Sequence, residues 1–415
     1  MDGNALTAAV PPAPLTLAEP PGAEPPGAEP PGAEPPAPLV PYAPGFQADP
    51  YPVLARLRES DAVASIPHPF LPDVPAWLVL RHAAVRALVT EGKVVKPVEE
   101  GEPPSLNSAP PDHTRLRALV QQGFSTGRIE GMRARVQRVA DDLVDGFAAR
   151  GEADLIAELT GPLPVAVTAE MLGVPEDEHG EVRRRTAGFL YGESPEGRDR
   201  SFAESWEYLT ELVAAKRARP GADMTSALIA ARDGQDRLSE DELLRMLLTL
   251  LVNGFATTIW FLASAVHALL AAPSQLDLLR ERPDLLPGAV EEALRYEPVV
   301  SGVTWVAERG LIVDGVPIGQ GDLLITSFQS ANRDPRVFAD PDRFDITRSP
   351  NPHLGFSHGI HRCLGAPLAR LETRIVLATV LRRLPGLRLA GEPRWQPNKV
   401  VRGLEALPVT FIPQP

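Results

Sequence analysis

Near its C-terminus the chain reads Phe356-Ser-His-Gly-Ile-His-Arg-Cys363-Leu-Gly-Ala-Pro-Leu-Ala-Arg370, and this stretch contains the only cysteine among the 415 residues. Glycines at positions 355, 359 and 365 allow a tight loop that brings backbone N–H groups close to the sulfur. Pro367 favours the first turn of a helix, and the apolar residues that follow recur with a helical period. Cys363 is therefore predicted at a helix N-terminus, where unpaired N–H groups and the helix dipole favour a thiolate.

The pattern Phe-x-x-Gly-x-x-x-Cys-x-Gly in this stretch resembles the haem-binding loop of the cytochrome P450 family. The resemblance implies a b-type haem whose iron is ligated by the Cys363 thiolate, a ligand that favours cleavage of the O–O bond. It also implies haem contacts from Phe356, His361 and Gly365. A lone cysteine is more often an inert core residue, but the length of this motif argues against that alternative.

The resemblance extends from about residue 42 to the C-terminus and implies the fold of the family. That fold is mainly α with small β-sheets, and it holds the haem between a long central helix and the helix after the cysteine loop. Residues 1–40 are Pro-rich and repeat Pro-Pro-Gly-Ala-Glu three times. Such a segment has too little apolar surface to offset its ordering entropy. We expect a disordered tail over 1–40 and a catalytic domain over 41–415.

Charge and composition narrow the classes of partner. The formal net charge of −13 argues against binding to nucleic acid or to an anionic membrane surface. A single cysteine excludes an internal disulfide and fits the reducing cytoplasm. The segment 246–270 is apolar and long enough to cross a bilayer, but Asn253 and Gly254 interrupt it and acidic residues precede it. It is predicted to be a buried helix of a soluble protein.

The middle of that helix, Asn253-Gly-Phe-Ala-Thr-Thr258, resembles the oxygen-binding groove of the family. Thr257 matches the threonine that helps to deliver protons to oxygen. The acid that normally precedes it is missing, because Ala256 stands there. The proton path is then expected to use ordered water, Thr257, Asn253 or the substrate itself. Glycine and threonine weaken a helix here, which makes a local bulge plausible.

Two further motifs concern the haem surroundings. His113 and Arg117 lie four residues apart on one face of a helix that begins at Asp112, and the resemblance implies that they grip a haem propionate. The family usually has a second propionate-binding arginine where this chain has Trp305. An indole N–H can donate one hydrogen bond but carries no charge. One propionate is therefore expected to be held less firmly than in relatives with arginine.

The spacing Glu292-x-x-Arg295 is a weak signal alone, because ordinary surface ion pairs look the same. At this position it resembles the pair that braces the haem-side core, and we interpret it as structural. The resemblance also implies a substrate pocket formed by the 91–111 loop and by side chains from separate segments. The candidates are Phe189, Phe255, Ala256, Val299, Val300, Val303 and Val400.

Three functions are compatible with these residues. The first is a haem-thiolate monooxygenase that uses O2 and two electrons from an external redox partner to oxidise a small organic substrate, expected to be a natural product. The second is oxidative coupling or dehydrogenation of an aromatic or peptide-like substrate without oxygen insertion, which Ala256 favours if the substrate supplies its own proton. The third is a catalytically silent partner protein, which ranks last because Cys363 is present.

The electrons are expected from a separate ferredoxin and ferredoxin reductase, because the chain has no flavin or nicotinamide fingerprint. Such a partner would dock over the cysteine. Arginines at positions 115, 362, 370 and 374 could offer positive charge to an acidic ferredoxin. An ordinary solvated basic face explains them equally well.

Overall fold

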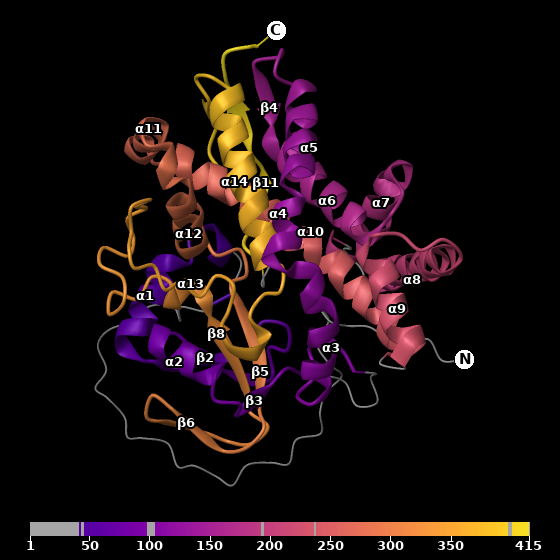
Figure 1. The fold of residues 1–415 in the computed structure, drawn as a ribbon. Helices are drawn as coiled ribbons and strands as arrows, with labels where there is room; N and C mark the ends of the chain where they lie inside the picture. Colours follow the sequence, from indigo (N-terminus) through magenta and orange to yellow (C-terminus); the bar gives the residue numbers. More distant parts are fainter. Residues whose placement is uncertain are drawn as a thin grey trace.

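The computed structural model describes residues 41–42, 45–97, 104–191, 195–235, 238–396 and 401–414 (Figure 1). The predicted N-terminal tail, residues 1–40, lies outside these ranges. Most of the described residues are helical, and the strands among them form four small sheets. The expected fold class, mainly α with small β-sheets, is confirmed.

The α-helices follow one another along the chain as given next. They are α1 Tyr51–Ser60, α2 His82–Leu88, α3 Asp112–Gln121, α4 Thr126–Gly131, α5 Arg133–Asp145, α6 Pro162–Leu172, α7 His179–Tyr191, α8 Pro195–Ala218, α9 Met224–Gln235, α10 Glu240–Leu270, α11 Pro273–Glu281, α12 Leu286–Tyr296, α13 Phe328–Ala331 and α14 Ala366–Arg383. The short turns are η1 Phe46–Ala48, η2 Gln122–Phe124, the π-helical η3 Ile156–Thr160, η4 Glu176–Glu178, η5 Pro283–Leu285 and η6 Gly359–His361.

The strands belong to a five-stranded sheet and three smaller ones. The larger sheet has the order β1 Val63–Pro67, β2 Pro75–Val79, β8 Leu323–Ser327, β5 Gly302–Ala307 and β3 Val94–Val95. The smaller sheets pair β6 Leu311–Val313 with β7 Val316–Ile318, β10 Arg394–Trp395 with β11 Leu404–Ala406, and β4 Glu152–Asp154 with β12 Pro408–Thr410 and β9 Arg388–Leu389. Strands β6 and β7 form a hairpin, and β8 pairs with β2 and β5 in the larger sheet.

Helix α10 is the central element. Its first turn is closed by a capping box in which Ser239 and Glu242 each accept a hydrogen bond from the other's backbone N–H. In the described part of the chain α10 is the one helix long and apolar enough to cross a membrane, with a mean hydropathy of 1.8, yet 78% of that window is buried inside the fold. It packs against α6, α8, α12 and α14. It is therefore a core helix, as the polar residues in its middle predicted.

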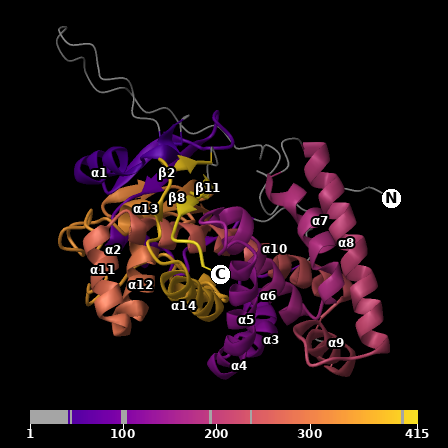
Figure 2. The same cartoon turned by 90° about the horizontal axis from the view of Figure 1, so that it is seen from above.

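Helices and sheets lie on different sides of α10. Figure 2 shows α7, α8 and α9 on one side, whereas α1, α2, α11, α12 and the strands β2 and β8 lie on the other. Helix α14 packs against α5, α10 and α12 and begins near the middle of the face in Figure 1. The parallel pairing of β2 with β8 joins the N-terminal segment to the chain that leads into the cysteine loop. The start of α14 thus lies between the side of the fold that contains α7, α8 and α9 and the side that contains the larger sheet.

Candidate functional site

The cysteine loop is held by contacts that require its glycines. Gly359 has a left-handed φ of +70°, and a Cβ there would lie 2.2 Å from the carbonyl oxygen of Val89. The loop therefore touches the end of α2 at a point where only glycine fits. The N–H of Cys363 donates to the carbonyl of Phe356 at 2.9 Å. Three residues later α14 begins, with Pro367 in its first turn, so the cysteine precedes a helix N-terminus as predicted.

Two influences act on the sulfur of Cys363. Desolvation raises the pKa of the thiol, whereas the backbone N–H groups of Gly365 and Ala366 and the charges of Arg117 and Arg370 act in the opposite direction. The net pKa is raised, so the helix start alone does not make a thiolate. The side chain of Cys363 is exposed. A metal cation at the sulfur would reverse the balance, since thiols bind metals as thiolates.

Phe356 joins this loop to both neighbouring helices. The guanidinium of Arg370, on α14, lies 4.7 Å from the centroid of its ring. The ring of Phe261, on α10, packs edge-on at 6.5 Å. Phe356 thus lies between the two helices that are expected to enclose the haem.

The predicted propionate-binding residues come together beside the loop. The imidazole rings of His113 and His361 lie 4.4 Å apart. His113 is 2% exposed, and neither of its ring nitrogens has a hydrogen-bond partner. Arg117 donates to the carbonyl of Arg362 at 2.6 Å. The structure therefore gathers a guanidinium and two imidazoles at one place.

Burial and neighbouring charge keep these imidazoles neutral. Desolvation lowers the pKa of His361 to about 3, with His113, Lys96 and Arg117 adding to the effect. Desolvation and Arg117 also lower the pKa of His113. Neutral rings donate and accept hydrogen bonds, so the fixed positive charge of this cluster is carried by Arg117 and Lys96.

Trp305 occupies the position at which the family usually has arginine, and its indole N–H already has a partner within the fold. The residue is 2% exposed. Its Nε1–H donates to the hydroxyl of Thr326 on β8 at 3.3 Å. The ring lies 5.6 Å from that of His361, and the ammonium of Lys96 sits 4.5 Å from its centroid. Lys96 was not among the site residues predicted from the sequence.

The motif in the middle of α10 presents polar groups from an otherwise buried helix. Asn253 is exposed and Thr257 half-buried, whereas Phe255 and Ala256 are buried. The hydroxyl of Thr258 donates to the carbonyl of Gly254 at 3.0 Å. The helix continues as α-helix through this segment, so the expected bulge is absent. Gly254 has a packing reason instead, because a Cβ there would lie 2.6 Å from Thr168 on α6.

Some of the predicted pocket residues are brought together and others are not. The carbonyl of Val299 accepts the N–H of Arg402 at 2.7 Å, and Val300 forms a β-bridge with Val401. These contacts join the segment before β5 to the C-terminal turn. Phe255 packs in the main core and Val303 against the core beneath the larger sheet. Val400, the side chain of Phe189 and residues 98–103 of the predicted loop lie outside the described residues.

Glu292 and Arg295 form a fully buried bidentate ion pair, with N–O distances of 2.7 and 2.8 Å. Arg295 also donates to the carbonyls of Asn332, Pro341 and Arg343. Glu292 accepts from the backbone of Asp345 and from the side chains of Arg348 and Asn351. Because every partner lies in the chain between β8 and the cysteine loop, the pair fixes the approach to Cys363.

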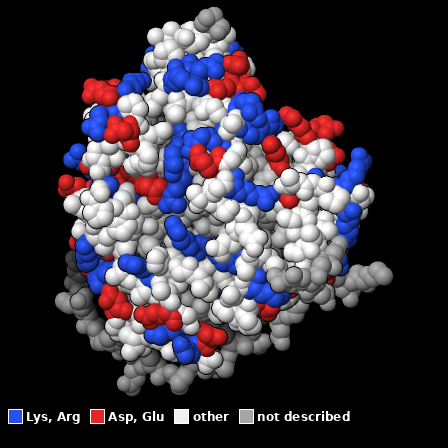
Figure 3. All heavy atoms as spheres, viewed as in Figure 1, with Lys and Arg blue, Asp and Glu red and all other residues white. Residues whose placement is uncertain are grey.

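The four arginines that could contact a redox partner differ in whether a carboxylate of the chain already neutralises their charge. Arg115 pairs with Asp112 at 3.0 Å and with Glu242 at 2.5 Å. Arg370 pairs with both oxygens of Glu291 at 2.7 Å. Arg362 is exposed, and the Nε of Arg374 is buried without a partner. Figure 3 shows basic and acidic side chains interspersed over this face rather than one positive patch.

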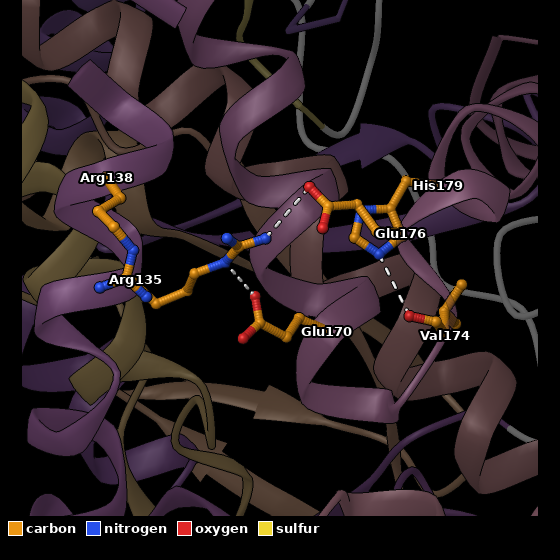
Figure 4. Close-up of a pocket in the computed structure, with 6 residues that line it drawn as sticks. All are labelled: Arg135, Arg138, Glu170, Val174, Glu176 and His179. Carbon is orange, nitrogen blue, oxygen red and sulfur yellow. Dashed lines mark hydrogen bonds and ion pairs between the residues drawn. The ribbon is translucent and has the colours of Figure 1, made fainter. Parts of the chain in front are cut away.

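A hollow elsewhere on the molecule has a different character. It measures about 340 Å³ and lies where α5, α6 and the start of α7 meet. Figure 4 shows Arg135 reaching Glu170 and Glu176, at 2.6 and 3.5 Å. His179 meets the carbonyl of Val174 at 3.3 Å. These groups satisfy one another, and none belongs to the predicted site.

The residues around Cys363 fit a thiolate-ligated haem. The site has two parts. One is the sulfur of Cys363, which receives two backbone N–H groups; the other is the cluster of Arg117, Lys96 and the two imidazoles. The ring nitrogens of His113 are buried and unpaired, and unpaired buried polar groups are rare in a finished site. An iron porphyrin with two carboxylates would satisfy both parts. Cys363 would hold the iron, and the cluster would hold the carboxylates.

Comparisons with known proteins agree on one family. The Cytochrome P450 family model matches residues 206–386. The chain is 42% identical over 384 residues to cytochrome P450 monooxygenase PikC of Streptomyces venezuelae, covering 88% of this chain and 92% of that protein. It is 39% identical over 376 residues to mycinamicin IV hydroxylase/epoxidase of Micromonospora griseorubida, covering 86% and 94%.

A solved structure extends the comparison to a different reaction. The P450 enzyme CxnD, described as forming a C–S bond in chuangxinmycin biosynthesis, superposes with a TM-score of 0.82 at 34% identity. The alignment covers 88% of this chain and 96% of CxnD. Proteins similar to this chain over most of its length therefore include both oxygen-inserting and bond-forming enzymes.

Proposed function

Because the chain belongs to the cytochrome P450 family and is a P450 monooxygenase oxidoreductase, we propose that it oxidises a polar aromatic or peptide-like natural product. The observation that carries the oxidation chemistry is the cysteine loop, in which Cys363 precedes α14, whereas the polarity of the substrate is inferred from Ala256. When bound, the haem supplies activation of O2. In monooxygenation one oxygen atom enters the product and the other leaves as water, with two electrons and two protons consumed.

Cys363 is the proposed iron ligand, and His113, Arg117 and His361 are the proposed carboxylate partners of the haem. Phe356 packs against the ligand loop, and Gly365 contributes an N–H to the sulfur. These N–H groups withdraw charge from a thiolate and so tune how strongly it donates to the metal. The chain thus supplies the ligand, its orientation and the electrostatics around it.

Proton delivery is assigned to Thr257 and Asn253. No hydrogen bond from the Thr257 hydroxyl to another described residue occupies it, and Asn253 is exposed on the same helix. Each can hold a water molecule and pass a proton along it. Ala256 offers no carboxylate, so a substrate with its own N–H or O–H would complete the path. This is the reason for proposing a polar substrate.

Oxidative coupling is the second candidate, and Ala256 is the residue that favours it. A substrate that gives up two hydrogen atoms supplies two electrons and two protons, and with two further electrons and protons both oxygen atoms leave as water. Groups that can donate a proton are also those at which an aromatic radical forms. The printed description of CxnD as a C–S bond-forming enzyme supports keeping this candidate.

The electron donor is proposed to be a ferredoxin with its reductase, in the cytoplasm. Because Arg115 and Arg370 are already paired, docking would depend more on Arg362 and Arg374. Changing Arg362 to Glu should slow reduction by ferredoxin but leave reduction by dithionite unchanged. A matched control is Arg115→Gln, which removes a charge that is already neutralised. Equal rates for wild-type and Arg362→Glu would contradict this docking face.

The experiment that separates the two reactions is turnover under isotopically labelled O2. Label in the product at one atom per molecule means monooxygenation, whereas unlabelled dimerised or cyclised product means coupling. The substrate proposal has its own test in the same experiment. Full label incorporation with a purely aliphatic substrate, at a rate above that for polar aromatic substrates, would overturn it.

A further inference from the structure

The position of Lys96 is set by backbone pairing. Strand β3 pairs antiparallel with β5, with Val94 opposite Ala307 and Val95 opposite Val306. One residue further in this register, Lys96 lies opposite Trp305. Side chains opposite each other on antiparallel strands are neighbours, which explains why the Lys96 ammonium reaches 4.5 Å from the centroid of the indole.

Lys96 carries a charge for which the described residues provide no carboxylate. Burial lowers the pKa of its ammonium to about 8, and its charge helps to lower the pKa of His361. The face of Trp305 compensates only part of the cost, because a cation–π contact is weaker than an ion pair. Lys93, three residues earlier, is instead paired with Glu91 at 2.6 Å. Lys96 is half-buried, and a partly desolvated cation without an anion is costly unless a ligand supplies one.

We propose that Lys96 pairs with a haem carboxylate and replaces the strand arginine whose place Trp305 has taken. This inference rests on the proposed haem site. Trp305 cannot bind the carboxylate itself, because its Nε1–H donates a hydrogen bond to the hydroxyl of Thr326. Its buried ring forms the platform on which the lysine lies, next to His361. The positive charge is then carried by Lys96, just after β3, instead of by an arginine at position 305 on the neighbouring strand β5.

The charges of the cluster then balance. A haem has two carboxylates, and the cluster has two cationic side chains, Arg117 on α3 and Lys96 after β3. The imidazoles of His113 and His361 lie next to each other, with His361 beside Trp305, and both rings can add hydrogen bonds to the carboxylates. Under this proposal each carboxylate has a cation, which differs from the expectation drawn from sequence, in which Trp305 left one carboxylate without a cation.

The test is haem retention, measured as the rate of haem transfer to apomyoglobin. Replacing Lys96 with Met removes the charge and keeps most of the apolar stem. Haem should be lost about tenfold faster, the factor expected for one charge-assisted hydrogen bond. Lys96→Arg should stay close to wild-type. Lys93→Met is the matched control on the same segment and should not change the rate.

Two further arms identify the group that Lys96 contacts. With the dimethyl ester of the haem, which has no carboxylates, Lys96→Met and wild-type should lose haem at the same rate. In a Trp305→Arg background, Lys96→Met should have little effect, because the arginine restores the cation. A faster loss that persists with the ester would show that Lys96 acts through packing and would overturn the proposal.

The outcomes for this inference and for the haem site itself are distinguishable. Thermal unfolding of each apo-protein shows whether a variant has lost its fold. A wild-type protein without a thiolate-type spectrum would refute the haem site. Wild-type protein with that spectrum, and Lys96→Met indistinguishable from Lys93→Met in haem transfer, would refute the role of Lys96 alone.

Discussion

The imidazole rings of His113 and His361 contact each other in a tilted arrangement, with centroids 4.4 Å apart, and both ring nitrogens of His113 are buried without a hydrogen-bond partner. One ring comes from α3 and the other from η6, beside the cysteine loop. An unsatisfied buried group costs about 1–3 kcal/mol. The fold therefore carries a cost in this place that a bound ligand can recover.

Replacing His113 with Phe should separate stability from cofactor binding. The apo-protein should become more stable, by about 1 kcal/mol, because two unpaired nitrogens are removed. Haem loss to apomyoglobin should become faster, because a hydrogen-bond partner of the carboxylates is gone. Urea unfolding of the apo-protein and haem transfer measure the two effects. A variant that is less stable and retains haem normally would show that His113 is only a packing residue.

Cys363→Ala should abolish the thiolate-type spectrum. The reduced carbon monoxide complex of the wild-type protein is expected to absorb near about 450 nm, as a thiolate-ligated haem does. The variant should lack this band even if it retains some haem through the carboxylate cluster. A band at about 420 nm in undamaged wild-type protein would refute the ligand assignment.

Thr257→Ala should raise the share of electrons that end in peroxide. We assign the hydroxyl of Thr257 to holding a water molecule in place. Without this hydroxyl the water is not ordered, and protons are delivered to the oxygen with the wrong timing. Thr258→Ala is the matched control, because the hydroxyl of Thr258 already donates to the carbonyl of Gly254. Peroxide and product are measured per NADPH consumed through the reductase. Equal peroxide yields for the two variants would exclude Thr257 from the relay.

Glu372 on α14 should make the protein less stable as the pH rises. Its carboxylate is buried with both oxygens unpaired, and desolvation raises its pKa from 4.5 to about 8. The folded protein therefore holds a proton that the unfolded chain releases above about pH 4.5. The associated stability is complete below that pH and is lost as the pH rises to 8, at up to roughly 1.4 kcal/mol per pH unit.

The measurement is denaturant unfolding of wild-type and Glu372→Gln between pH 5 and 9. The stability difference between the two proteins should grow with pH, in favour of the variant, and level off above the folded-state pKa. Because the variant shares every other titrating group, the difference isolates Glu372. A constant difference across this range would show that the carboxylate is ionised in the folded state.

Glu292→Gln should destabilise the protein by roughly 3–5 kcal/mol, because it leaves Arg295 buried without its partner. The pair is 0% exposed on both sides. Asp277 and Arg280 have the same spacing on α11 but are 68% and 40% exposed. Asp277→Asn should therefore cost less than about 1 kcal/mol. Similar losses for both variants in urea unfolding would contradict the importance of burial.

The features that the sequence predicted well are those set by near neighbours in the chain. The cysteine loop, the start of α3 and the buried part of α10 over 246–270 follow from glycine, proline and apolar spacing within a few residues. The Glu292–Arg295 pair is also local. Its depth in the fold is not, since its other partners lie between residues 332 and 351.

The features that were missed depend on contacts between distant segments. Lys96 gains its place from the pairing of β3 with β5, about 210 residues further along the chain. Arg115 appeared free in the sequence, but Glu242 at the start of α10 neutralises it. The bulge expected in α10 is absent. Gly254 is instead required by the close contact of α10 with Thr168. A single sequence contains no local signal for such pairings.

The parallel pairing of β2 with β8 also has a consequence for biosynthesis. The ribosome makes β2, at Pro75–Val79, long before β8, at Leu323–Ser327. At ordinary rates of translation this interval lasts on the order of tens of seconds. During it the apolar strands β1 and β2 have no parallel partner and offer an open edge. Nascent chains that end before Ser327 should therefore bind chaperones, and acquisition of haem should begin only after synthesis is nearly complete.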